Sequence, residues 1–213
     1  MKNKQKGSFF VSVGLLLIAA ALALVCYNRL ENCLVANFNE DIMGEMRIVM
    51  AEITVSEAVG LPSPTVSEIE YPDYVLNPNM DMPVKKVDGH NYSSVLQIPS
   101  INLELPILSN YVYDHLRRSP CRYLGSPYTK DMVICAHNYE VHFGNLKHVS
   151  VDDEVILTDM DGNVFRYRIA EVVTLDPYVS AETLRNGYAL TLFTCTVGGR
   201  SRVVVHCELE SKT

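Results

Sequence analysis

The chain has 213 residues, of which 48% are hydrophobic and 20% are charged, and its formal net charge is −7. This composition supports one packed domain with additional segments and excludes wholesale disorder. Three lysines lie within the first six residues, so the remainder is more acidic than the total, which argues against nucleic acid as the main partner. The sequence also lacks a glycine-rich phosphate loop.

An uncharged apolar run covers residues 9–27, where Ser12 is the only strongly polar side chain. As a helix it would extend about 28 Å, close to the hydrocarbon thickness of a bilayer. The preceding lysines predict a cytoplasmic N-terminus and an exported body. A cleaved signal peptide is the alternative, with cleavage at residues 21–23, but the apolar run continues through Cys26. We therefore assign residues 1–27 to a cytoplasmic N-terminus and a transmembrane anchor.

Residues 28–91 are predicted to form a juxtamembrane helix and a linker. Apolar side chains recur at helical spacing to about residue 58, which predicts a helix that either stands as a stalk or lies on the body. Five prolines then interrupt regular structure between residues 60 and 91, which indicates a linker or wrapping arm. Tyr71, Tyr74 and Val75 are candidates to anchor this arm. The apolar positions of the helix are Leu30, Leu34, Phe38, Ile42, Met46, Val49 and Ile53.

Residues 92–213 form the body, where short apolar segments alternate with turn signals. This pattern is typical of an all-β barrel or sandwich, and about eight strands would allow closure into a small barrel. Asp161-Gly162 is a strong hairpin signal. Short helices are expected at residues 111–118 and 181–185. The main expected strands cover residues 95–98, 101–107, 132–136, 155–158, 164–173, 190–193 and 202–209.

The chain has six cysteines and no CxxC pair. This spacing does not suggest a zinc site, and a chain of this size does not need disulfide bonds for stability. Cys135 and Cys207 lie in apolar runs and are predicted to be small buried hydrophobic residues, although pairing between them remains open.

Cys195 is the candidate nucleophile because it ends an apolar strand, which fixes a side chain and leaves it reachable. A glycine-rich turn follows it, and Arg202 opens the last strand. A thiol with a pKa of about 8.5 needs a nearby cation or base at neutral pH. Arg202 would hold a substrate carbonyl and favour an oxyanion. Arg200 is its competitor, but it lies within the turn and is less fixed.

His137 is the candidate base because it also ends an apolar strand, and two strand ends can share one rim of a barrel. His142 and His148 follow it in a loop, so a metal site of three histidines is the alternative. These residues lack the i,i+4 spacing and the HExxH glutamate of a helical zinc site, so we expect no metal here.

Together these residues resemble the sortases, the cysteine transpeptidases of Gram-positive surfaces. Residues 191–195 read Thr-Leu-Phe-Thr-Cys, which is similar to the family's TLxTC signature. His137 follows an apolar strand, and Arg202 precedes Val203-Val204-Val205, as in that family. The resemblance extends from about residue 95 to residue 208 in the order His, Cys, Arg.

The resemblance implies an all-β, eight-stranded barrel with short helices, behind an N-terminal transmembrane helix and a stalk. It implies that Cys195 attacks a C-terminal sorting signal, often LPxTG-like, and forms a thioacyl enzyme. His137 would protonate the leaving amine and deprotonate the incoming one, and Arg202 would hold the substrate and the oxyanion. Thr194 would help to bind the substrate. The reaction would need no nucleotide or organic cofactor.

The implied partners are a surface protein or pilin that carries the signal, and an amine acceptor from peptidoglycan or a pilin lysine. The implied location is the cell membrane, with the catalytic domain outside the cell. A thiol peptidase or hydrolase of the same fold is one alternative, and a non-enzymatic extracytoplasmic binding module is another. The sortase subclass, the sorting motif, the acceptor and any calcium dependence stay open, as does gating of the site by residues 28–91.

Overall fold

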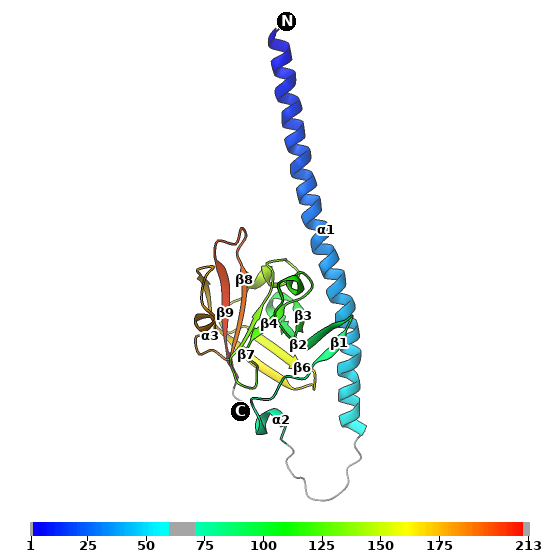
Figure 1. Cartoon of the computed structure of the whole chain (residues 1–213), viewed down its shortest axis with the longest axis vertical. Helices are drawn as coiled ribbons and strands as arrows, with labels where there is room; N and C mark the ends of the chain where they lie inside the picture. Colours follow the sequence, from blue (N-terminus) through cyan, green and yellow to red (C-terminus); the bar gives the residue numbers. More distant parts are fainter. Residues whose placement is uncertain (1, 60–70, 211–213) are drawn as a thin grey trace, which may run out of the picture.

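A computed structural model describes residues 2–59 and 71–210 of the chain. One uninterrupted helix, α1 (Lys2–Val59), contains both the expected anchor and the expected juxtamembrane helix. Its N-terminal half extends away from the rest of the molecule, and its C-terminal half lies beside a β-barrel (Figure 1). The apolar segment of α1 is long and apolar enough to cross a membrane, and its most apolar part is not buried by the rest of the protein.

Eight strands close into a barrel in the order β2-β3-β4-β5-β8-β9-β7-β6, and β6 pairs back onto β2. The sequence-based prediction of an eight-stranded all-β barrel is therefore confirmed. A ninth strand, β1 (Lys85–Val87), pairs only with the start of β2 and lies outside the closed ring. The ring consists of β2 (His90–Ile98), β3 (Leu103–Leu108), β4 (Cys121–Leu124), β5 (Met132–Cys135), β6 (Glu154–Asp159), β7 (Val164–Leu175), β8 (Leu190–Cys195) and β9 (Arg202–Leu209).

Short helices lie between these strands and before them. The helix expected at residues 111–118 is present as the shorter 3-10 helix of residues 113–117, and the helix expected at residues 181–185 has those bounds. The predicted hairpin around Asp161-Gly162 joins β6 to β7. The proline-rich segment at residues 60–91 was expected to lack regular structure, but it contains β1 and the start of β2. The helices are α2 (Asp73–Leu76), α3 (Ala181–Arg185), and the 3-10 helices η1 (Pro99–Ile101), η2 (Tyr113–Arg117) and η3 (Phe143–His148).

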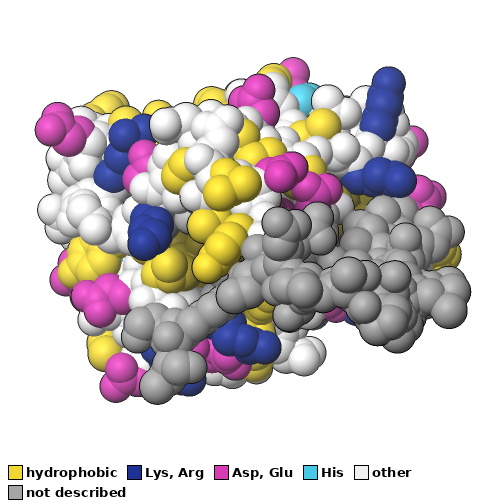
Figure 2. All heavy atoms as spheres, turned by 90° about the horizontal axis from the view of Figure 1, so that it is seen from below, with side chains coloured by type: hydrophobic (Ala, Val, Ile, Leu, Met, Phe, Trp, Pro, Cys, Tyr) yellow, Lys and Arg dark blue, Asp and Glu magenta, His cyan; other side chains and the backbone are white. Residues whose placement is uncertain are grey.

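The arm before the barrel is held by an aromatic stack. Tyr74 in α2 stacks on Tyr128 at a centroid distance of 4.8 Å and contacts Phe165 at 5.3 Å. The prediction that Tyr74 anchors the arm is confirmed, whereas Tyr71 and Val75 remain largely exposed. Seen from below, this end of the molecule carries apolar, basic and acidic side chains side by side, the mixed texture of a water-exposed surface (Figure 2).

The C-terminal half of α1 packs against the outside of the barrel. Ile42, Met43 and Met46 are each at most 4% exposed and join a cluster that includes Tyr92 and Leu108 of the barrel. Burial of each such side chain stabilises the contact by about 1.5–3 kcal/mol. The helix therefore lies on the body, which is one of the two arrangements expected from its apolar pattern.

The prediction that the apolar stripe of this helix is a packing face is wrong for the first part of the stripe. Leu30 and Leu34 are 63% and 69% exposed, although they continue the spacing that leads to Ile42 and Met46. The reason is geometric, because a strict i,i+4 spacing advances about 40° around a helix of 3.6 residues per turn at every step. Over four steps the stripe turns by about 160°, so Leu30 points away from the side that carries Met46.

Polar contacts add to this packing. The amide nitrogen of Asn39, which is buried, lies 2.9 Å from Nε2 of the fully buried His142 in the barrel. Arg47 forms an ion pair with Glu104 of β3. Burial, and then the neighbouring His137, lower the pKa of His142 to about 4, so its ring is neutral at physiological pH. A neutral Nε2 accepts the hydrogen bond that Asn39 donates.

Acidification is expected to destabilise the folded chain through His142. An unfolded histidine binds a proton below its ordinary pKa of about 6.5, whereas folded His142 resists protonation until about pH 4. The unfolded state therefore binds more protons in this window, and the free energy of unfolding falls by on the order of 3 kcal/mol as the pH falls through it. Urea unfolding of the detergent-solubilised chain across this pH range measures the loss.

The matched variants are His142→Gln and His148→Gln, since His148 is exposed at the end of the same helix, η3. His142→Gln is expected to flatten the pH dependence in this window, and His148→Gln is expected to leave it unchanged. Equal pH slopes for the native chain and His142→Gln would contradict the assignment.

Candidate active site

The β8–β9 hairpin brings Cys195 and Arg202 together. These two residues are direct partners in the antiparallel register and form the last pair before the turn that joins β8 to β9. Nη1 of Arg202 lies 3.8 Å from Sγ of Cys195. Nε of Arg202 donates to the carbonyl of Pro177 at 3.0 Å, and the guanidinium lies 5.1 Å from the ring centroid of Phe193. Arg200 is exposed in the turn, so the geometry favours Arg202 as the partner of the thiol.

The parallel pairing of β5 with β8 brings His137 to the same end of the barrel. Cys135 is the partner of Phe193, so the parallel register, continued two residues past the end of β5, aligns His137 with Cys195 at this edge. The register is held past the end of β5 because Ala136 N donates to the Phe193 carbonyl at 3.2 Å. The hydroxyl of buried Thr194 donates to the Ala136 carbonyl at 2.9 Å and thereby joins the two strand ends.

His137 lies between two aromatic rings that the sequence did not single out. The ring of Tyr113 in η2 is 6.1 Å away and edge-on, and the ring of Tyr139 is 5.1 Å away. Burial lowers the pKa of His137 from its ordinary value, the cation of Arg117 lowers it further, and the carboxylate of Glu31 opposes both. The imidazole is therefore neutral at physiological pH in the absence of substrate.

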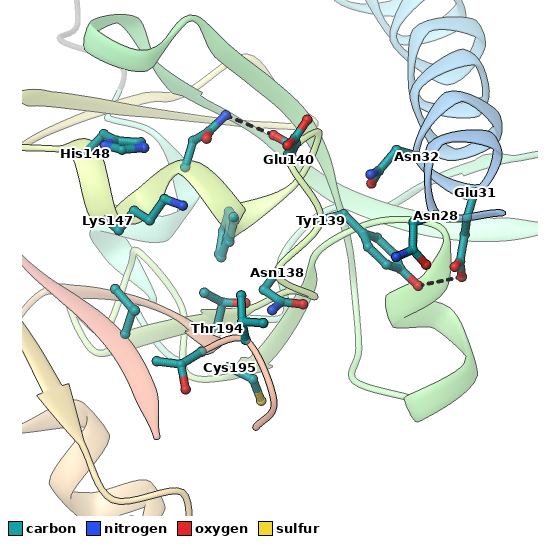
Figure 3. A pocket seen from close by; sticks show the side chains of 16 residues that line it. Asn28, Glu31, Asn32, Asn138, Tyr139, Glu140, Lys147, His148, Thr194 and Cys195 are labelled. Atoms are coloured by element: carbon teal, nitrogen blue, oxygen red, sulfur yellow. Dashed lines mark hydrogen bonds between the residues drawn. The ribbon is translucent and has the colours of Figure 1, made fainter. Parts of the chain in front are cut away.

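A pocket of about 510 Å³ opens beside Cys195 (Figure 3). One wall comes from the barrel, through Thr194, Cys195 and the segment that follows His137, and the opposite wall comes from α1. Glu31 of α1 points across the gap and accepts a hydrogen bond from the Tyr139 hydroxyl at 3.0 Å (Figure 3). The residues that α1 contributes to the pocket are Asn28, Glu31 and Asn32.

The other cysteines of the barrel differ sharply from Cys195, which is exposed. Cys121, Cys135 and Cys207 are buried free thiols, as predicted for the last two, and no disulfide joins any cysteine of the described residues. Burial raises the pKa of Cys121 to about 12 and raises those of Cys135 and Cys207 as well. These three thiols are therefore protonated and shielded, and Cys195 is the reactive candidate.

Three further histidines occupy different environments. His142 is buried against Asn39, and His148 is exposed at the end of η3. His206, predicted to be structural, is buried in β9, lies 3.0 Å from the Thr191 hydroxyl and stacks on Tyr188. Within residues 2–59 and 71–210, no group of three or more His, Cys, Asp or Glu side chains is arranged to hold a metal ion.

Comparison of the structure with solved proteins found sortases. The sortase D5 transpeptidase of Clostridium perfringens has a TM-score of 0.51 and 21% identity over 60% of this chain and 83% of its own. Sortase C1 of Streptococcus agalactiae has a TM-score of 0.51 and 22% identity over 60% and 72% of the two chains. A lid mutant of sortase A from Corynebacterium diphtheriae has a TM-score of 0.50 and 20% identity over 80% and 96%. At these identities the likeness shows the fold.

A search of curated proteins found no match. The family model for the sortase domain matches residues 96–210, which is more than half of the chain and includes every strand from β3 to β9. The chain belongs to the sortase family.

Proposed function

We propose that this protein is a membrane-anchored sortase that cleaves a C-terminal, LPxTG-like sorting signal and transfers the protein to an amine acceptor. Membership of the sortase family supports a transpeptidase. The observation that carries the specific mechanism is the pairing of Cys195 with Arg202, with Sγ 3.8 Å from the guanidinium, beside the parallel register that aligns His137. The acceptor is an amine of a cell-wall precursor or a pilin lysine.

In the first half-reaction, the Cys195 thiolate attacks the carbonyl carbon before the scissile bond. The carbonyl oxygen gains negative charge in the tetrahedral intermediate, and the fixed guanidinium of Arg202 stabilises it. His137, as imidazolium, gives its proton to the leaving amine, and collapse of the intermediate forms a thioacyl bond at Cys195. The released fragment is the part of the substrate that follows the cleaved bond.

In the second half-reaction, an incoming amine attacks the thioacyl carbon while neutral His137 accepts its proton. Collapse of the second tetrahedral intermediate forms the new amide bond and releases the Cys195 sulfur. Arg202 again faces the developing oxyanion. We assign Thr194 a supporting role in substrate binding, because it lines the pocket while its hydroxyl joins the ends of β5 and β8.

The resting enzyme holds few reactive ion pairs. With ordinary pKa values of about 6.5 and 8.5, the imidazolium–thiolate form would amount to about 1% of the enzyme at neutral pH. Burial and Arg117 lower the pKa of His137 and so reduce this fraction further. The proposed enzyme is therefore expected to be slow, because only a small fraction of it holds the reactive imidazolium–thiolate pair.

The apolar part of α1 is the proposed anchor, with the N-terminus in the cytoplasm and the barrel outside the cell. The lysines before the apolar run support this orientation. A single helix that continues from the proposed span into the packed contact with the barrel supports a fixed distance between the membrane and the site.

Substitutions in the β8–β9 hairpin test whether Arg202 or Arg200 stabilises the oxyanion and whether Cys195 is the nucleophile. Cys195→Ala is expected to abolish both thioacyl formation and transfer, and Arg202→Ala is expected to lower kcat by about 10²–10³-fold, as for loss of an oxyanion-stabilising group. Arg200→Ala is the matched control and is expected to stay close to native activity. The measurement is turnover of a sorting-signal peptide with glycine or lysine amines, with the thioacyl enzyme followed by mass spectrometry.

Turnover by Cys195→Ala would exclude cysteine catalysis. If the native enzyme only hydrolyses the peptide with every acceptor amine tried, the transfer reaction is wrong and a thiol hydrolase is the correct assignment.

The acid limb of the pH–rate profile is expected to lie below the ordinary histidine pKa, because burial lowers the pKa of His137. Arg117→Gln removes a cation that disfavours imidazolium, so it is expected to move this limb to higher pH. Glu31→Gln removes an anion that favours imidazolium, so it is expected to move the limb to lower pH. The measurement is kcat/KM against pH, and shifts of the same sign in both variants would contradict this electrostatic account.

A further inference from the structure

The active-site pocket lies directly beyond the apolar segment of α1. The uncharged run of α1 ends at Tyr27, and the pocket wall that α1 supplies begins with Asn28 and extends to Asn32. The helix is continuous through this boundary, and its C-terminal half is fixed to the barrel by Met46 and its buried neighbours. The depth of the site relative to a membrane is therefore set by a helix without a flexible joint in this region.

The dimensions of a bilayer place this pocket in the headgroup layer. A hydrocarbon core of about 30 Å within a total of about 40–45 Å leaves a polar layer of roughly 5–8 Å on each side. At a rise of about 1.5 Å per residue, this layer covers roughly four or five residues of helix. Residues 28–32 of α1 therefore occupy the headgroup layer when residues 9–27 span the hydrocarbon.

The turn between β8 and β9 reaches the same depth. Cys195, Thr196 and Val197 line the pocket opposite Asn28 of α1. Figure 1 shows this turn at the end of the barrel that faces the N-terminal half of α1, with the C-terminus at the opposite end. The turn is closed by hydrogen bonds between Thr196 and Ser201, so its tip is held in a defined shape.

The tip of this turn is apolar and exposed. Val197 is 90% exposed and Tyr178 is 93% exposed, the two highest values for large apolar side chains among the described residues. Both lie at this end of the barrel, since Tyr178 follows Pro177, which is hydrogen-bonded to Arg202. Single exposed apolar residues are ordinary on protein surfaces, but these two occur beside the proposed membrane. Arg200, exposed in the same turn, adds a cation suited to lipid phosphates.

We propose that the β8–β9 turn rests on the surface of the bilayer that holds α1, with Val197 inserted among the lipid headgroups. This inference rests on the proposed anchoring of α1 and adds a second point of membrane contact. In this arrangement Cys195 lies at the depth of the lipid headgroups. Its acyl donors and amine acceptors would themselves be held at the membrane surface. A lipid surface suits the turn because its tip combines an apolar side chain with a nearby arginine.

The chain contains no tryptophan, so one introduced tryptophan is a unique fluorescent probe. We would compare three full-length variants reconstituted in phosphatidylcholine–phosphatidylglycerol vesicles: Val197→Trp at the turn, Leu17→Trp in the apolar run and Val164→Trp at the far end of β7. Position 164 is eleven residues from Leu175, the partner of Arg202, and so lies roughly 35 Å along the strand from the site. Quenching is measured with lipids brominated near the carbonyl end or near the middle of their acyl chains.

Tryptophan at position 17 is expected to be quenched by bromine near the middle of the chains. Tryptophan at position 197 is expected to be quenched by the shallow bromines, and tryptophan at position 164 by neither. Quenching at position 197 no stronger than at position 164, with position 17 quenched, would overturn the docking of the turn and leave the anchor intact. An unquenched position 17 would overturn the anchor and the docking together.

Thioacyl formation from a sorting-signal peptide in detergent micelles is measured on the same three variants. Val164→Trp is expected to form the thioacyl enzyme as the native chain does, which verifies that this variant is folded before reconstitution. This measurement also separates the membrane contact from the chemistry, because loss of quenching with an intact thioacyl reaction counts against the docking alone.

Discussion

The arrangement of the proposed catalytic residues depends on the parallel pairing of β5 with β8. Strand β9 then pairs antiparallel with β8. Two strands that run in the same direction end at the same edge, so the segment that carries His137 leaves β5 at the edge where β8 ends in Cys195. The hairpin then returns Arg202 to the thiol through direct pairing with Cys195. Backbone pairing fixes where the chain carries these residues, and the hydrogen bond from Arg202 to the Pro177 carbonyl holds its guanidinium near the thiol. The Thr194 hydroxyl strengthens the weakest place in this arrangement, just beyond the end of β5.

The second constraint is the attachment of α1 to the outside of the barrel. Apolar burial at Met46 and its neighbours supplies most of the contact, and the Asn39–His142 hydrogen bond fixes its register. A helix clamped in this way places Glu31 against Tyr139, within electrostatic reach of His137. Packing around Ile42 and Met46 therefore positions Glu31, about three to four turns of helix away, where its charge acts on His137.

Sequence patterns predicted the parts of the site that arise from local structure. Cys195 and Arg202 flank one turn, and His137 ends an unmistakable apolar run, so strand ends and the hairpin were sufficient to nominate them. Glu31 could not be nominated, because its contact with Tyr139 spans 108 positions and depends on how α1 lies on the barrel. Leu30 has a different reason, because its i,i+4 spacing follows the buried positions while the drift of about 40° at each step turns its side chain away from the barrel.

The two constraints meet at the pocket beside Cys195, which has one wall from the barrel and one from α1. In the proposed reaction, transfer to an amine competes with hydrolysis of the same thioacyl bond, so the exposed Cys195 thiol needs a way to limit water around it. The barrel alone leaves one side of this pocket open. Asn28, Glu31 and Asn32 close that side with polar groups, and they belong to the helix that we propose enters the membrane. We therefore propose that the choice between acceptor and water depends on the presence of α1 as well as on the three proposed catalytic residues.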